Sequence, residues 1–260
     1  MTQARALLAE FYMALVQLRR YPTESISQLV GLTVLFYGLF LGASYMSGNP
    51  LLGHRLSDII VSYGLWTLCL GAVANIGHEI GNEAQNGTLE QVFLIPLGGG
   101  RIFLYRGIAQ LVSQVILTSV VILIISLITR HHLSFSALDL VPMAMASLSA
   151  MGVGYLVASV TLLFKRSGQL LSIVQFILLF FIMIPFSSFH GWLIDVTIFV
   201  PLGPMIASLK QMMVDGHGLL TVHGWFWWGF VNVALWLGIG YLVFLKTSRK
   251  AARLGVLGHY

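Results

Sequence analysis

Long apolar runs separated by short polar stretches make up most of the chain. Most of these runs approach or exceed the roughly 20 residues that an α-helix needs to cross a bilayer. The pattern therefore predicts an all-α membrane protein with a single transmembrane domain over residues 1–260. The six expected spans cover residues 26–46, 59–78, 102–128, 138–164, 170–185 and 225–245.

The first 24 residues differ, because charged side chains stand between apolar ones at helical spacing. The charged positions are Arg5, Glu10, Arg19 and Arg20. Such a pattern is typical of an amphipathic helix on the membrane surface, and no uninterrupted apolar core marks a signal peptide. We expect residues 1–24 to form this interface helix, which Tyr21-Pro22 ends. The alternative is that the segment begins the first span.

A polar stretch from Glu79 to Pro96 separates the second and third spans. Thr88 and Gln91 have the spacing of a capping box, so a short helix is expected to begin near Thr88. Glu90 would lie in its first turn, where a carboxylate favours the positive end of the helix dipole. Pro96 would end it, which leaves a short amphipathic helix within residues 83–96.

Between the fifth and sixth spans the chain stays apolar but carries Pro185, Pro201 and Pro204. These prolines exclude one uninterrupted helix. Irregular backbone at membrane depth is tolerated only where protein or a water-filled cavity covers it. Residues 186–212 are therefore expected to form two short re-entrant helices that shape an external gate.

Eleven of the 14 Lys and Arg residues fall on one side of this six-span topology. The exceptions are Arg55, Arg130 and Lys210. Because cytoplasmic loops hold Lys and Arg in excess, both chain ends and residues 79–96 are expected to be cytoplasmic. Most of the net charge of +5 then comes from cytoplasmic Lys and Arg residues that set the orientation in the lipid bilayer. The charge therefore implies no nucleic-acid partner.

Composition and motifs argue against an enzyme. Hydrophobic residues make up 57% of the chain and charged residues only 9%, against about 25% charged in soluble domains. No G-x-x-x-x-G-K-[ST] sequence occurs, and the glycine run at residues 98–100 is better interpreted as a flexible joint. Cys69 lies in an apolar run, so we expect it to be a core residue. One metal site is left open as an alternative, at His131, His132 and Asp139.

The polar stretch also carries a family signature. Glu83, the sequence Asn86-Gly87-Thr88-Leu89-Glu90 and then Pro96 match a pattern of an acidic residue, Gly-Thr-Leu-Glu and a following proline. With six spans and an N-terminal surface helix, the chain resembles an ABC-2 type permease, the transmembrane subunit of a type V ABC exporter. Arg19-Arg20-Tyr21-Pro22 agrees more loosely with the same family.

The resemblance implies that residues 83–96 are a coupling helix on a separate ATP-binding subunit. Two copies of that subunit would bind ATP and Mg, and a second permease copy would complete a homo- or heterodimer, so this chain would need no cofactor. The implied setting is a bacterial-type plasma (inner) membrane. The alternative is that residues 83–96 are an ordinary solvated loop. The implied coupling residues are Glu83, Gly87, Thr88, Leu89, Glu90, Val92, Phe93 and Pro96.

The implied function is outward transport of a hydrophobic or amphipathic small molecule, or of a lipid. Aromatic residues of the first and fifth spans are candidates for the translocation path, with lipid-facing or core positions as the alternative. These aromatics are Phe36, Phe40, Phe176, Phe180 and Phe181. Other functions left open are export of a lipid-linked polysaccharide, a secondary transporter or channel without an ATPase, and a membrane enzyme acting on lipid.

Overall fold

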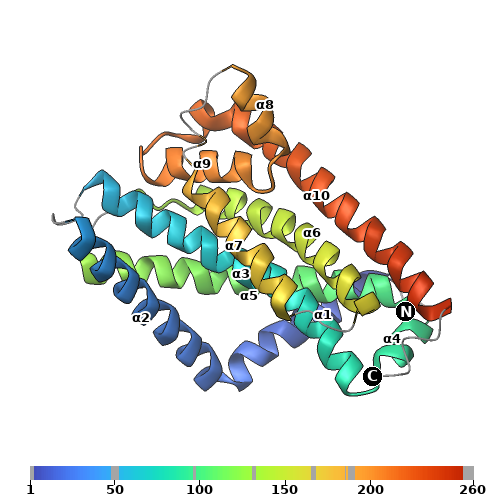
Figure 1. Ribbon diagram of the computed structural model, residues 1–260. Helices are drawn as coiled ribbons and strands as arrows, with labels where there is room; N and C mark the ends of the chain where they lie inside the picture. The colour runs from blue at the N-terminus through green and yellow to red at the C-terminus, as the bar shows by residue number, and fades with distance from the viewer. Residues whose placement is uncertain are drawn as a thin grey trace.

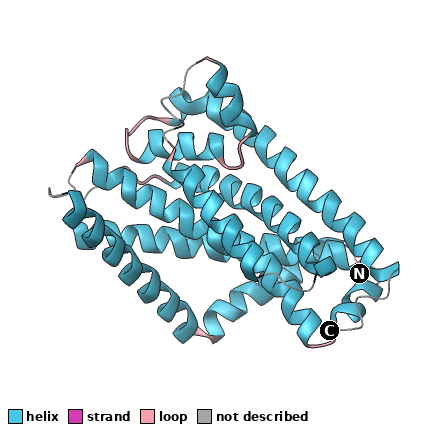
Figure 2. Cartoon of the chain, in the orientation of Figure 1, coloured by secondary structure: helices cyan, strands magenta, loops and turns pink. Residues whose placement is uncertain are grey.

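The computed structural model describes residues 3–47, 53–95, 98–130, 133–164, 168–184, 186 and 191–253. Within these residues every regular element is helical, as Figures 1 and 2 show, so the expected all-α class is confirmed. The helices are α1 Gln3–Arg20, α2 Pro22–Ser47, α3 His54–Gln85, α4 Leu89–Leu94, α5 Gly99–Thr129, the 3₁₀ helix η1 Ala137–Asp139, α6 Leu140–Phe164, α7 Gly168–Met183, α8 Trp192–Phe199, α9 Gly203–Met213 and α10 Leu219–Arg253.

Five of the described helices are long and apolar enough to cross a membrane. They cover Pro22–Gly42, His54–Glu83, Gly99–Thr129, Ala137–Leu162 and Thr221–Ala251. The fifth expected span, residues 170–185, corresponds to α7, which has only 16 residues. At 1.5 Å per residue α7 is about 24 Å long, shorter than the roughly 30 Å of a bilayer's hydrocarbon core. Length and composition thus support five spans directly.

The central helix is α6, which packs between α3 and α10 (Figure 1). Small residues permit this packing, because helices in lipid approach closely only where side chains are short. At Gly152 of α6 an added Cβ would lie 2.4 Å from the backbone of Trp236, and at Gly240 of α10 it would lie 2.0 Å from the carbonyl oxygen of Gly152. The two backbones therefore touch.

Helix α2 diverges from this bundle and meets α1 at an open angle (Figure 1). Only 6% of the apolar part of α2 is buried. Among the described residues of this helix, Phe36 alone has a fully buried side chain. The Tyr63 hydroxyl of α3 donates to the carbonyl oxygen of Leu32 and fixes α2 at mid-length. Most of α2 is therefore an apolar surface available to lipid or to another protein.

The short helices expected within residues 186–212 are α8 and α9, which lie at the end of the molecule opposite α4 (Figure 1). Asn232 of α10 donates to the carbonyl oxygens of Ile198 at 2.6 Å and Val200 at 2.9 Å, which satisfies the end of α8. Lys210 of α9 pairs with Asp58 of α3 at 3.0 Å. Helices α8 and α9 are thus fixed to the middle part of α10 and to the beginning of α3.

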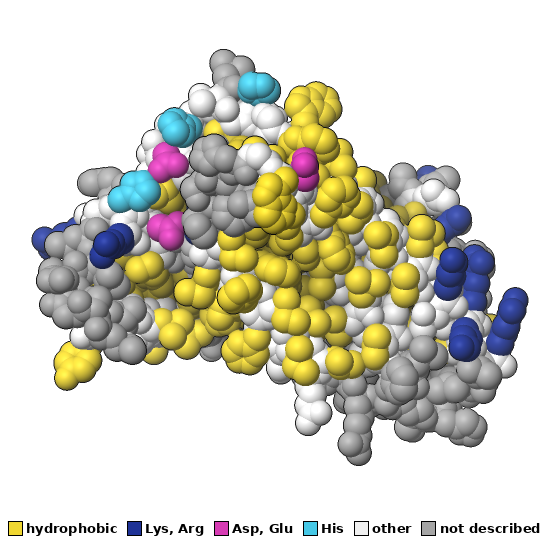
Figure 3. Space-filling model, turned by 45° about the horizontal axis from the view of Figure 1, so that its top comes forward, with side chains coloured by type: hydrophobic (Ala, Val, Ile, Leu, Met, Phe, Trp, Pro, Cys, Tyr) yellow, Lys and Arg dark blue, Asp and Glu magenta, His cyan; other side chains and the backbone are white. Residues whose placement is uncertain are grey.

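The surface separates by side-chain type in Figure 3. A broad apolar surface lies between an end rich in Lys and Arg, near the C-terminal turn of α10, and an opposite end that carries acidic, His and further Lys or Arg side chains. Arg249, Lys250 and Arg253 belong to the helical end of α10, which extends eight residues beyond the expected limit of the last span. An apolar belt between polar ends is what a bilayer requires.

Candidate functional site

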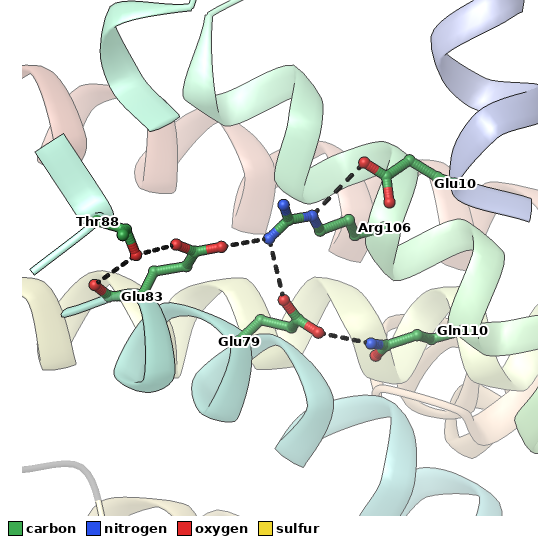
Figure 4. A network of polar contacts seen from close by, with 6 residues as sticks. All are labelled: Glu10, Glu79, Glu83, Thr88, Arg106 and Gln110. Carbon is green, nitrogen blue, oxygen red and sulfur yellow. Dashed lines mark hydrogen bonds and ion pairs between the residues drawn. The ribbon is translucent and has the colours of Figure 1, made fainter. Parts of the chain in front are cut away.

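Arg106 is the centre of a polar network at the end of the bundle that carries α4 (Figure 4). Its Nη1 lies 2.6 Å from Glu83 Oε1 and 3.3 Å from Glu79 Oε2, and its Nε lies 3.5 Å from Glu10 Oε1. Gln110 donates its Nε2 to Glu79 Oε1 at 2.7 Å. One guanidinium therefore joins the first, third and fifth helices of the chain.

Helical spacing explains how the sequence builds this network. Glu79 and Glu83 are four residues apart on α3, and Arg106 and Gln110 are four residues apart on α5, so each pair shares a face. Helix α3 continues to Gln85, so the first part of the polar stretch is helical and not an interruption of the span. It continues because Arg106 and Gln110 compensate the charge and polarity of its two carboxylates.

Thr88 connects the network to α4. Its hydroxyl donates to the Glu83 carboxylate at 2.5 Å, and its backbone N–H donates to the Glu83 carbonyl oxygen at 2.9 Å. The expected helix start near Thr88 is confirmed, since α4 begins at Leu89. The expected capping box with Gln91 is wrong. Thr88 has helical angles (φ −96°, ψ −7°), and its hydroxyl binds the stronger acceptor, the carboxylate of Glu83.

The buried face of α4 packs on its own chain. Leu89 and Val92 are only 1% and 6% exposed, and the ring of Phe93 lies 6.1 Å from that of Phe103 on α5. The expectation that these side chains anchor a partner is therefore wrong for Leu89 and Val92. A six-residue helix cannot hold itself together in water, so its apolar face stabilises it against the bundle.

The other face of α4 is open. Glu90 and Gln91 are exposed, and Leu94 is 77% exposed although it is apolar. Gly87, just before the helix, has φ +68°, a left-handed conformation that glycine adopts without strain. Pro96 lies outside the described residues. An exposed surface of mixed apolar and acidic character thus lies next to the Arg106 network.

The expected flexible joint at residues 98–100 is wrong for its last two glycines. Gly99 and Gly100 belong to the first turn of α5 and are buried. A Cβ would lie 2.6 Å from the ring of Phe93 at Gly99, and 2.3 Å from Leu245 Cδ2 at Gly100. These glycines let α4 and α10 pack closely against α5, which makes this corner compact.

Charge in the network is unbalanced, because three carboxylates surround one guanidinium. Burial in the protein raises the pKa of Glu10 above its ordinary 4.5, and the Glu79 carboxylate adds to the shift, while Arg106 opposes it. A carboxyl whose pKa rises on folding favours the folded state in its protonated form. The contribution of Glu10 to stability is therefore full below its ordinary pKa and falls as the pH rises through the folded-state value.

The Glu10→Gln variant tests this sign. As the pH rises from the ordinary pKa of 4.5 through the folded-state pKa of Glu10, the free energy of unfolding of the wild type should fall relative to that of the variant, whose amide does not titrate. Thermal unfolding of both proteins in the same detergent at a series of pH values measures the difference. A wild type that gains stability over Glu10→Gln as the pH rises would contradict the assignment.

The four residues of the Arg19-Arg20-Tyr21-Pro22 motif, at the end of the expected interface helix, are exposed. Arg19, Arg20 and Pro22 are exposed, and Tyr21 is 51% exposed. As the sequence predicts, the helix ends at Arg20 and a new one begins at Pro22. The helix is held on the bundle by the face that includes Ala14 and Glu10, which pack toward α5.

The aromatic candidates for a translocation path separate into two groups. Phe36 and Phe40 line a cavity of about 410 Å³ between α2, α3 and α7, together with Tyr63 and Trp66. In contrast, Phe176 and Phe180 are 70% and 66% exposed on α7, and Phe181 is half-buried. The structure thus brings Phe36 and Phe40 to one cavity and leaves Phe176 and Phe180 on the outer surface.

The metal alternative finds no support in the described residues. They contain no group of three or more His, Cys, Asp or Glu side chains placed to hold a metal ion. His131 and His132 lie outside them, and Asp139 accepts from the backbone N–H of Ser136 at 2.7 Å as part of a helix cap. Cys69 is buried, as its apolar surroundings in the sequence predict.

Four residues of the site were missed as site residues by sequence reasoning. The sequence pattern assigned no site role to Glu10, Glu79, Arg106 and Gln110. The available signal was one arginine near the start of an apolar helix, opposite two acids four residues apart. Residues four apart share a face of a helix, so Glu79 and Glu83 form one polar face and Arg106 and Gln110 form another.

A comparison with known protein families finds none that matches this chain, and a comparison with curated proteins finds no match either. The family resemblance therefore rests on the motif at residues 83–96 and on the helical architecture. What this architecture can do must be argued from the site itself.

Proposed function

We propose that this chain is the membrane-spanning subunit of an ATP-driven exporter, with hydrolysis performed by a separate ATP-binding chain. The observation that carries the proposal is the Arg106 network. It joins α1, α3 and α5, and Thr88 extends it to α4. A force applied to α4 by a partner would therefore reach three helices at once, because the contacts between them are half-buried and charge-assisted.

The exposed face of α4 has the character of a docking surface. Leu94 supplies an exposed apolar contact, and Glu90 supplies a negative charge that attracts a basic partner. The buried side chains of Leu89 and Val92 pack α4 against the bundle, so that α4 would move with it. The two faces of α4 would thus have separate roles, with Leu89 and Val92 toward the bundle and Glu90 and Leu94 toward the partner.

The finer topology also belongs to the proposal. Helix α7, the fifth expected span along the chain, would bring the total from five to six, since an apolar helix shorter than the bilayer is accommodated by local thinning of the membrane or by its neighbours. Six spans would place both chain ends in the cytoplasm beside α4. The aromatic cavity between α2, α3 and α7 would then be part of the path taken by an amphipathic substrate, completed by a second permease copy.

Two variants of the exposed face test coupling. Leu94→Asp and Glu90→Lys should each lower substrate-dependent ATP hydrolysis of the reconstituted complex by about tenfold or more, because an interface anchor is worth roughly 1.4 kcal/mol or more. Neither change should alter the unfolding temperature of the isolated chain, since both side chains are exposed.

Leu138→Asp is the matched control, because Leu138 is 50% exposed at the other end of the molecule, in η1. It should leave hydrolysis unchanged. Full coupling in both α4 variants would show that this helix is not the contact with the ATPase.

The proposal as a whole is tested by gentle extraction from the native membrane and identification of every chain that co-purifies. A stoichiometric chain with a Walker A lysine is the expected result. Reproducible isolation of this chain alone, active in vesicles under an ion gradient, would instead establish a secondary transporter.

A further inference from the structure

Two adjoining cavities form a polar recess beside the Arg106 network. The outer cavity has a volume of about 380 Å³ and the inner one about 220 Å³. Both are lined by Ala14, Gln17, Tyr21 and Gln110, so they share a wall made by α1 and α5. The recess thus extends from the surface helix α1 into the space between α2, α3 and α5.

The inner cavity is lined by polar, mostly uncharged side chains. Asn75 of α3, Gln28 of α2 and the α5 pair Ser113 and Gln114 contribute amides and a hydroxyl. Gln114 is the sixteenth residue of the 31 in α5, about 22 Å along the helix axis. Polar side chains at this depth of an apolar helix are costly in a bilayer and mark functional sites.

The structure holds these amides in place without satisfying all of them. Gln114 donates to the carbonyl oxygen of Thr67 at 3.2 Å and lies over Gly71, where a Cβ would approach the amide carbon to 2.4 Å. The Oε1 atom of Gln110, on the wall shared by both cavities, is buried and has no hydrogen-bond partner. A buried acceptor without a partner is unfavourable, and a ligand hydroxyl would relieve it.

Charge decides which head group fits. Among the described residues that line the inner cavity, Glu24 is the charged one, so a phosphate group would be repelled there. In the outer cavity Arg106 is already paired with Glu10 and Glu79, and Arg20 is an exposed side chain of the lining. Amide side chains both donate and accept, which matches hydroxyl groups.

We infer that this recess binds the head group of the transported amphiphile, and that this head group is uncharged and rich in hydroxyls, as in a glycosylated lipid. The inference rests on the proposed function, since it names the substrate class of the same permease. The apolar part of the ligand would lie against α2, which exposes apolar side chains such as Ile26 at 57% and Val30 at 56%.

The test measures lipid retention by native mass spectrometry on the intact chain, in a detergent without a sugar head group. Three probes with the same acyl chains are compared: glucosyl diacylglycerol, diacylglycerol and phosphatidylglycerol. The wild type should retain the glucosyl lipid about tenfold better than either of the others, which corresponds to about 1.4 kcal/mol. Gln28→Leu and Ser113→Val should each lower that retention about fivefold.

Ser119→Ala is the matched control on α5, since the Ser119 hydroxyl donates to Val115 of its own helix and does not line the recess. It should retain the glucosyl lipid as the wild type does. Gln28 is exposed, so its change to leucine cannot act by unfolding the bundle. Equal retention of all three probes, or unchanged retention in both recess variants, would overturn the inference.

Because lipid retention needs no ATPase, its failure is distinguishable from failure of the proposed function. Loss of the lipid preference in a chain that still co-purifies with an ATPase overturns the substrate class alone. Retention of the glucosyl lipid by a chain that has no ATPase partner would support the binding site and contradict the proposed exporter function.

Discussion

Replacing Arg106 with methionine should lower the free energy of unfolding by about 3–5 kcal/mol, because it leaves half-buried carboxylates without their shared cation. Glu83 and Glu79 are only 17% and 30% exposed in their side chains, so water replaces the guanidinium poorly. Reversible unfolding of the purified chain in mixed micelles measures the loss. The same variant should also loosen α4, detected as faster amide hydrogen exchange at residues 88–94.

The control for this variant is Arg101→Met on the same helix. Arg101 is exposed, and its replacement should change stability by less than about 0.5 kcal/mol. Adding Glu10→Gln, Glu79→Gln and Glu83→Gln to Arg106→Met should recover much of the lost stability, since removing all partners of a buried ion pair is often close to neutral. An Arg106→Met variant as stable as Arg101→Met would show that the network contributes no stability.

A second large effect is expected at the crossing of α6 and α10, where Gly240→Ala should destabilise the chain by about 3 kcal/mol. The added methyl group would lie 2.0 Å from the carbonyl oxygen of Gly152, and backbone cannot move aside as a side chain does. The two helices would have to separate along their contact. The same unfolding experiment in mixed micelles measures the effect.

Gly238 is the matched control, because it lies in the same helix and a Cβ there would meet nothing within 4 Å. Gly238→Ala should be neutral or stabilise the chain by up to about 1 kcal/mol, as expected for alanine in a helix. If both glycine variants behave alike, the close approach of the two backbones is not present in solution.

The sequence predicted the helices well where apolar runs are long. The spans expected at residues 102–128 and 138–164 correspond closely to α5 and α6, and the break at Tyr21-Pro22 falls where α1 ends. Hydrophobic periodicity and proline act locally, so both can be interpreted without knowing the fold. The same holds for Cys69, whose apolar neighbours predicted burial.

Helix ends were predicted less well, because tertiary contacts determine them. Helix α3 continues through Glu79 and Glu83 since Arg106, on another helix, compensates their charge. Gly99 and Gly100 begin α5 because Phe93 and Leu245 pack over them. In the sequence, the stretch with Glu79 and Glu83 is a polar break and Gly99-Gly100 is part of a glycine run, and both patterns are typical of loops.

The sequence by itself determined the all-α class, the long apolar helices and the position of the short helix α4, because each depends on residues within a few turns of one another. Only the tertiary structure decided which face of α4 is buried, that Thr88 binds Glu83, and that three acids meet Arg106. Those outcomes depend on side chains from up to 96 positions apart, such as Glu10 and Arg106, whose proximity follows from helix packing and not from local pattern.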